Sequence, residues 1–195
     1  MTSDAIRTLT QVVQVLEGIG LDDAIGGSVA SSVFGEPRAS AHADLLVDLP
    51  ESHVPHLVAR LENDLYVSED AARDAVREQS CFNVGHLETM YKVDLFVAGS
   101  GTQDREQLSR RKNVVIARDP ERRAHVTAPE NFVVRKLDWY RHGGGVSDQQ
   151  WRDVCGVLKV QGSRLDRGYL KRLAGQVGLA DLLERAIRES GLDAP

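Results

Sequence analysis

Two glycines and a serine stand where a short apolar strand gives way to a helix, an arrangement that suits the binding of phosphate. The segment reads Ile25-Gly26-Gly27-Ser28. Glycine lets the backbone approach an anion closely because it has no Cβ. The helix that follows offers backbone N–H groups and the positive end of its dipole, and Ser28 adds a hydroxyl. Taken alone, this segment is better explained as an ordinary strand-to-helix turn capped by Ser28, because the pattern is short and common.

Four polar residues then occupy alternate positions at the entry to a strand. They are Arg38, Ser40, His42 and Asp44, followed by Leu45-Leu46-Val47. Side chains at positions i and i+2 of a strand face the same side. Two aspartates placed in this way can hold magnesium ions, which bridge nucleotide phosphates and stabilise the charge of nucleotidyl transfer. In this chain the first of those two positions carries an imidazole.

A third carboxylate is expected from a neighbouring strand, where it completes the site and orients or deprotonates the attacking hydroxyl. The candidate is Asp94, which is flanked by Val93, Leu95 and Phe96 in an otherwise apolar strand. The alternative is an edge strand whose polar face is solvated.

These residues resemble the pattern of the DNA-polymerase-beta-like nucleotidyltransferase superfamily. That pattern is Gly-Gly-Ser on a strand-to-helix turn, then Arg-x-Ser/Thr-x-Asp-x-Asp and an apolar run. The resemblance implies a nucleotide-binding loop of Gly26, Gly27 and Ser28. It also implies nucleotide binding by Arg38, metal binding and catalysis by Asp44 and Asp94, and a catalytic position at His42. His42 departs from the family, which has its first aspartate there.

The imidazole of His42 leaves three interpretations open, because a neutral imidazole suits borderline metals better than Mg²⁺. The first is a weakened transferase that still binds nucleotide. The second is an active enzyme that works with one metal, with Mn²⁺, or with His42 as a base. The third is a fold kept for binding a nucleotide or a partner, without nucleotide chemistry.

Two polar positions in the C-terminal part extend the resemblance to bacterial nucleotidyltransferase-like proteins related to abortive-infection toxins. Those proteins carry a Pro-Glu-x-x-x-x-x-Lys-Leu helix and an Arg-Asp helix, and their lysine and aspartate line the nucleotide site. The matching residues are Lys136 and Asp153. A lysine there can bind phosphate as a point charge. The alternative is a structural ion pair between two helices.

Hydrophobic periodicity predicts an α+β fold in two parts. Residues 1–128 are predicted to form a nucleotidyltransferase-like α/β domain with a small mixed sheet flanked by helices. The predicted strands are 23–26, 43–49, 81–87, 90–97, 114–116 and 125–127, and the predicted helices are 4–18, 28–34, 51–64, 69–79 and 103–111. Residues 129–195 are predicted to form a helical C-terminal subdomain, with helices at 130–141, 147–160, 166–177 and 179–190.

Composition limits the other possibilities. The 42% hydrophobic content of the 195 residues is that of an ordinary globular protein. The net charge of −5 argues against a general nucleic-acid coat. Two cysteines without a CxxC pair predict reduced thiols. No apolar run has the roughly 20 residues of a membrane helix, so a cytoplasmic protein without a membrane partner is expected.

Two basic clusters and four histidines complete the candidates. The clusters are residues 110–112 and the group Arg118, Arg122 and Arg123. They form either an exposed loop or a polyanion-binding patch for tRNA. Four other histidines lack the spacing of metal ligands: His53, His56, His86 and His125.

Together these features predict Mg²⁺- or Mn²⁺-dependent transfer of a nucleotidyl group from an NTP to a hydroxyl acceptor. The acceptor is an RNA such as tRNA, a protein side chain or a small molecule. The resemblance also implies a toxin of a toxin–antitoxin or phage-defence pair, with an antitoxin as its partner. The alternative function is a catalytically impaired module that binds a nucleotide or a partner.

Overall fold

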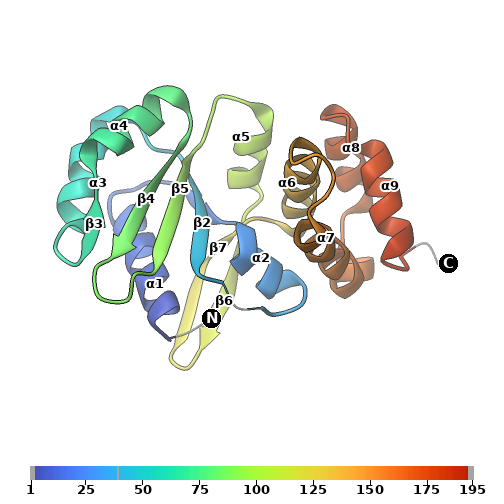
Figure 1. Cartoon of the computed structure of the whole chain (residues 1–195), viewed down its shortest axis with the longest axis horizontal. Helices are drawn as coiled ribbons and strands as arrows, with labels where there is room; N and C mark the ends of the chain where they lie inside the picture. Colours follow the sequence, from blue (N-terminus) through green and yellow to red (C-terminus); the bar gives the residue numbers. More distant parts are fainter. Residues whose placement is uncertain (1–2, 39, 193–195) are drawn as a thin grey trace. The chain divides into compact units, whose positions relative to one another are not determined.

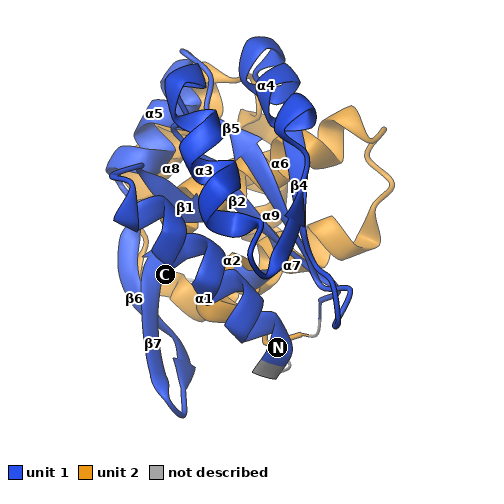
Figure 2. Cartoon of the chain, turned by 90° about the vertical axis from the view of Figure 1, so that its left-hand side faces the viewer, with its two compact units in different colours: residues 1–29, 39–127 blue, residues 30–38, 128–195 orange. Residues whose placement is uncertain are grey.

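The structure, a computed structural model, describes residues 3–38 and 40–192. These residues form two compact units (Figure 1 and Figure 2). The first unit, blue in Figure 2, ends at residue 29 and resumes for residues 39–127. The second unit, orange in Figure 2, contains residues 30–38 and the chain from 128 onward. The first unit holds the sheet, and the second is helical.

A seven-stranded mixed sheet organises the first unit. Its strands are β1 (Asp23–Ile25), β2 (His42–Val47), β3 (Leu65–Val67), β4 (Cys81–His86), β5 (Lys92–Val97), β6 (Lys112–Arg118) and β7 (Glu121–Val126). Their order across the sheet is β3-β4-β5-β2-β1-β7-β6. β2 pairs in parallel with β5, and β1 pairs in parallel with β7. The other neighbouring strands are antiparallel. The sequence did not predict β3, which is three residues long and too short to show alternation.

Helices cover both faces of this sheet. They are α1 (Ser3–Gly18), α3 (Val54–Leu61, entered through the 3₁₀ turn η1, Glu51–His53), α4 (Glu69–Glu78) and α5 (Thr102–Ser109). α1, α3 and α4 lie on one face, and α5 lies on the other (Figure 1). The residues of β2 and β5 that face α1 are all buried: Ala43, Leu45, Val47, Val93, Leu95 and Val97. Strict alternation of these residues therefore leaves one face of the strands for polar side chains.

The side chains on that second face change from polar to apolar along β2 and β5. Near the ends of β2 and β5 it is apolar, because Leu46 and Phe96 pack with Ala24 of β1 and Leu108 of α5. Near their beginnings it carries polar side chains. Leu108 of α5 thus covers the apolar part of this face.

The second unit is a helical bundle that includes the end of helix α2. α2 (Gly27–Phe34) begins directly after β1. The other helices are α6 (Pro129–His142), α7 (Asp148–Gln161), η2 (Gly162–Arg164), α8 (Arg167–Gln176) and α9 (Ala180–Glu189). Gln161 Nε2 donates a hydrogen bond to the carbonyl of Phe34 at 2.6 Å. A Cβ on Gly35 would lie 3.0 Å from a methyl of Val157, so the chain after α2 packs closely on α7.

The bundle has an apolar core contributed by each of its long helices. Its buried residues include Phe132, Val133, Leu137, Val154, Val157, Leu158, Leu170, Leu173 and Leu183. Side-chain caps start two of the helices: Ser147 accepts from the Gln150 N–H, and Asp166 accepts from the Tyr169 N–H. Helices within residues 3–38 and 40–192 do not combine the length and the apolar character that a membrane span requires.

Candidate active site

Two carboxylates lie side by side on the polar face of the sheet. Asp44 of β2 and Asp94 of β5 are directly paired in the parallel register of these strands. β5 lies between β4 and β2, so Asp94 is not on an edge strand, and the solvated-edge alternative is wrong. Asp44 is only 9% exposed, and Asp94 is half-buried. A pair of close, poorly solvated carboxylates is unfavourable by itself and attracts a cation.

His42 belongs to the same group of side chains. Its Nε2 lies 3.7 Å from Asp44 Oδ1. His42, Asp44 and Asp94 each offer one ligand atom, and these atoms lie within 4.8 Å of one another. Asn83 of β4, a residue that the sequence did not single out, donates its side-chain N–H to Asp94 Oδ1. The signal for Asn83 is its register, since β4 pairs it directly with Asp94.

Gly27 allows the glycine loop to approach Asp44. Gly27 has a φ of +51°, and a Cβ at this position would lie 1.6 Å from Asp44 Oδ2. The N–H of Gly26 donates to the Asp44 carbonyl at 2.8 Å. The absence of a side chain at Gly27 therefore makes room for the Asp44 carboxylate. Ser28 is buried, and its hydroxyl donates to the His42 carbonyl at 3.4 Å.

Burial and the negative charge of this pair raise the pKa of two neighbouring acids. Burial is the largest cause that raises the pKa of Tyr91 to about 12, and repulsion from Asp44 and Asp94 contributes to the same rise. Burial, with added repulsion from Asp94 and Asp44, raises the pKa of Cys81 to about 11. Cys81 is exposed and free of any disulfide. Both groups are therefore neutral near pH 7 and add no negative charge beside the pair.

A second polar cluster lies within the helical unit. Arg38 holds Asp153 through two hydrogen bonds, Nε to Oδ1 and Nη2 to Oδ2, each 3.0 Å long. Lys136 Nζ lies 3.7 Å from Asp153 Oδ2, and both side chains are less than 10% exposed. The ion pair that the sequence offered as an alternative is thus present, and Arg38, 115 residues away, completes it. Two cations around one carboxylate leave a net positive charge.

A cavity of about 370 Å³ adjoins this cluster. It is lined by Ser31, Glu36, Pro37, Arg38, Gln149, Arg152, Asp153 and Gly156. With its amide oriented to satisfy its neighbours, Gln149 accepts from both terminal nitrogens of Arg38 at 3.0 Å. The volume is at the lower end of those that hold small ligands.

We expect Asp153→Ala to destabilise the protein by about 3 kcal/mol or more, because it removes the buried carboxylate that pairs with Lys136 and Arg38. Lys136→Met is the matched control, since it leaves the two hydrogen bonds between Arg38 and Asp153 in place. Urea denaturation of both variants measures the difference. Equal stability of Asp153→Ala and the wild type would contradict a structural role for this ion pair.

The first basic cluster lies mainly in the connection between α5 and β6, where Arg110 ends the helix, and the second lies on exposed positions of β6 and β7. Arg118 ends β6, and Arg122 and Arg123 belong to β7. Arg111 donates to Asp22 at 2.6 Å, and Arg123 donates to Asn113 at 2.8 Å. Part of this positive charge is therefore already used in contacts within the unit.

The comparisons with known proteins concern the fold. No protein-family model matches the chain, and no curated protein sequence matches it. The chain is similar to an antigenic nucleotidyltransferase-like protein from Paracoccidioides brasiliensis, with 18% identity, a TM-score of 0.57, and coverage of 96% of this chain and 94% of that one. It is also similar to the antibiotic-resistance factor ANT(2'')-Ia, with 12% identity, a TM-score of 0.59, and coverage of 97% and 100%.

A third solved structure agrees with these two. The lincosamide antibiotic adenylyltransferase LnuA, in its lincomycin-bound form, shares 11% identity and a TM-score of 0.51, with coverage of 79% of this chain and 96% of that one. The predicted α+β fold, a mixed sheet flanked by helices and followed by a helical part, is confirmed as a nucleotidyltransferase fold.

Proposed function

We propose that this chain, which has the nucleotidyltransferase fold, transfers a nucleotidyl group from an NTP to a hydroxyl acceptor. One observation carries the proposal. Asp44 and Asp94 are paired in register on two interior strands, and Gly27 is the residue that lets the loop pass beside Asp44. A structural carboxylate pair would not need a loop backbone held against it. A phosphate-binding loop beside a cation site explains both features.

The side chains present fit a divalent cation. Asp44 and Asp94 would hold it through hard oxygen ligands, and His42 adds a nitrogen that favours Mn²⁺ over Mg²⁺. When bound, such an ion neutralises the phosphates of the NTP and the charge that develops on them.

The remaining steps fall to residues of the chain. The first turn of α2 directs backbone N–H groups toward the triphosphate, beginning at Gly27 and Ser28. Gly26 is already bonded to the Asp44 carbonyl, so it positions the loop rather than binding phosphate. Asp94 accepts the proton of the attacking hydroxyl as a general base. The hydroxyl oxygen forms a bond to the α-phosphorus of the NTP, the bond from that phosphorus to the β-phosphate breaks, and pyrophosphate leaves. Asn83 orients that carboxylate through its hydrogen bond to Oδ1.

Arg38 and Lys136 form the second part of the proposal. The resemblance assigns both to nucleotide binding together with Asp153, and their net positive charge supports that assignment. We expect Lys136→Met to weaken NTP binding by about tenfold, the loss of roughly one charged hydrogen bond. Calorimetric titration of NTP measures the affinity. An unchanged affinity would show that Lys136 serves only in the ion pair with Asp153.

A small hydroxylated molecule is the first acceptor to test. By name, two of the similar structures are an antibiotic-resistance factor and a lincosamide adenylyltransferase, and this chain spans nearly all of both. The other acceptors are an RNA 3′ end and a protein hydroxyl. A toxin of a toxin–antitoxin pair would use one of these two, and its cognate antitoxin would then suppress transfer.

The position of His42 favours the first of the three interpretations, an enzyme with weakened transferase activity. Its imidazole stands 3.7 Å from Asp44, where a positive charge on it would compete with a metal ion. We expect His42→Asp to raise Mg²⁺-dependent transfer by on the order of 10- to 100-fold, because it supplies a hard anionic ligand. Labelled NTPs with Mg²⁺ or Mn²⁺ measure transfer, and His56→Gln on the exposed surface of α3 is the control.

Three outcomes of that experiment are distinct. A faster His42→Asp variant supports the weakened enzyme. A wild type as fast as the variant shows that His42 is compatible with full activity. NTP binding without transfer in either protein supports the alternative function, a module that holds a nucleotide without reacting it.

A further inference from the structure

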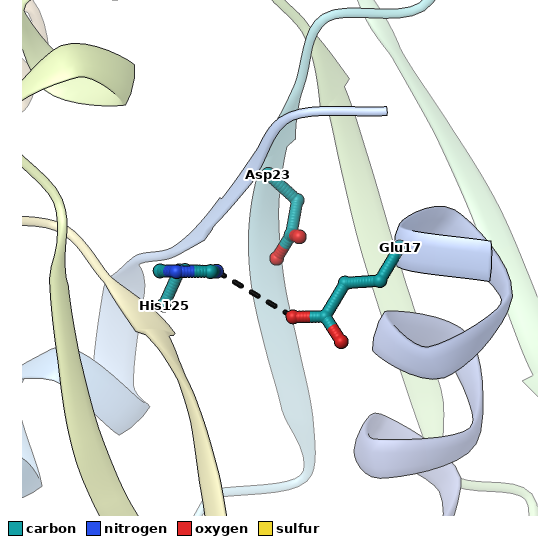
Figure 3. Close-up of side chains that lie close together, drawn as sticks. All are labelled: Glu17, Asp23 and His125. Carbon is teal, nitrogen blue, oxygen red and sulfur yellow. Dashed lines mark ion pairs between the residues drawn. The ribbon is translucent and has the colours of Figure 1, made fainter. Parts of the chain in front are cut away.

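Three other potential ligands converge on the far side of the same sheet. Glu17 comes from the last turn of α1, Asp23 from β1 and His125 from β7. Their ligand atoms lie within 4.8 Å of one another. His125 Nδ1 lies 3.5 Å from Glu17 Oε1, as the dashed line in Figure 3 marks. All three belong to the first unit, and no local spacing links them because His125 lies more than a hundred positions from Glu17 and Asp23.

Asp23 is the unusual member of this group. It is 1% exposed, and its Oδ2 has no hydrogen-bond partner among the described residues. Figure 3 shows the carboxylate directed toward the Glu17–His125 pair. A buried carboxylate oxygen without a hydrogen-bond partner destabilises the folded state, because its lost hydration is not replaced by a hydrogen bond. Burial, followed by repulsion from Glu17, raises the pKa of Asp23 to about 7.

The surrounding charges leave this carboxylate without adequate compensation. Arg111 lowers the pKa of Asp23, but its guanidinium is hydrogen-bonded to Asp22 at 2.6 Å. The last turn of α1 contains no basic residue, and Glu17 stands there at the negative end of the helix dipole. A cation between Glu17 and Asp23 would relieve both unfavourable arrangements.

We propose that Glu17, Asp23 and His125 form a binding site for a divalent transition-metal ion of the zinc type. The imidazole nitrogen selects against Mg²⁺ and Ca²⁺, which prefer oxygen ligands alone. Three protein ligands and a water complete the four-coordinate arrangement that zinc adopts. Side chains whose ligand atoms lie within 4.8 Å need only small rotations to reach one ion. Glu17 is exposed and His125 partly so, which gives the ion a path from solvent.

This site is separate from the carboxylate pair. Asp23 is paired with Val47 in the antiparallel ladder of β1 and β2, so the two side chains share a face. Val47 faces α1, whereas Asp44, an odd number of positions away, faces the other side. The ion would join α1, β1 and β7. Since β1 runs directly into Gly26, it would stabilise the strand from which the glycine loop starts.

The test removes the other candidate site first. In the full-length Asp44→Asn/Asp94→Asn variant, we expect calorimetric titration to detect one Zn²⁺ per chain and no comparable binding of Mg²⁺. In this background, His125→Gln, Glu17→Gln and Asp23→Asn should each weaken Zn²⁺ binding by on the order of 10- to 100-fold or more. His56→Gln, which removes an exposed imidazole on α3, should leave the affinity unchanged.

Thermal unfolding provides a second measurement that does not depend on titration. Zn²⁺ should raise the Tm of the background variant because it binds only the folded chain, and His125→Gln should remove that increase. In EDTA at pH 8, above the pKa of about 7, Asp23→Asn should unfold at a higher temperature than its parent, since it removes a buried charge. Equal Zn²⁺ affinity with and without His125, or no Zn²⁺ binding in the background variant, would overturn the proposal.

Discussion

We expect Asp94→Asn to abolish nucleotidyl transfer, with kcat lowered by on the order of 10³-fold or more. The change keeps the size of the side chain but removes its charge and its ability to accept a proton. It therefore removes both a ligand oxygen beside Asp44 and the general base. The strand pairing and the buried alternate positions of β5 are untouched, so the Tm should change little. Transfer from labelled NTP and thermal unfolding measure the two effects.

Asp48→Asn is the matched control for this experiment. Asp48 follows β2 directly and is exposed, and its backbone N–H bonds to the Asp22 carbonyl. The same change of charge at this position should leave kcat within about twofold of the wild type, since solvent and salt screen the charge of an exposed side chain. An Asp94→Asn protein that transfers as fast as the Asp48→Asn protein would exclude Asp94 from catalysis.

Gly27→Ala should inactivate the enzyme by displacing Asp44. The new Cβ would lie 1.6 Å from Asp44 Oδ2 and 2.6 Å from its Cγ, so the carboxylate must leave its place. The φ of +51° adds strain of roughly 1–2 kcal/mol for a residue with a side chain. We expect transfer to fall by on the order of 100-fold or more and the Tm to fall measurably. Both are obtained from the same purified variant.

Gly26→Ala separates this effect from a general loss of loop flexibility. A Cβ on Gly26 would have its nearest neighbour, the Asp44 carbonyl, at 3.8 Å, which is an ordinary contact. This neighbouring substitution should therefore preserve the Tm. Removing the displaced side chain in Gly27→Ala/Asp44→Ala should recover part of the lost stability but not the activity, a coupling expected of residues in contact. A Gly27→Ala protein with wild-type activity would contradict the observed approach of loop and carboxylate.

Local patterns in the sequence predicted which polar side chains share one face of the sheet. Residues 42 and 44 share a face because a strand alternates its side chains, and this holds whatever the strand packs against. Asp94 was recognisable because a carboxylate interrupts an apolar strand. The Gly26-Gly27 pair marked the turn into α2, where Gly27 has a positive φ and leaves no room for a Cβ beside Asp44.

The order of the strands was decided by the tertiary structure alone. Alternation indicates which side chains share a face, but not which strand is the neighbour. The structure puts β5 between β4 and β2, which pairs Asp94 with Asp44 on one side and with Asn83 on the other. Asn83 therefore could not be identified from its own segment.

The contacts between distant segments were also beyond the sequence. Arg38 reaches Asp153, and His125 reaches Glu17, across more than a hundred positions in each pair. No periodicity or motif in the sequence indicates either pair, because packing rather than local geometry brings these side chains together. The sequence by itself thus determined the chemistry available along β1, β2 and β5. Packing of the sheet and of the helical bundle determined which of those side chains meet, since only a folded chain brings remote residues within hydrogen-bonding distance.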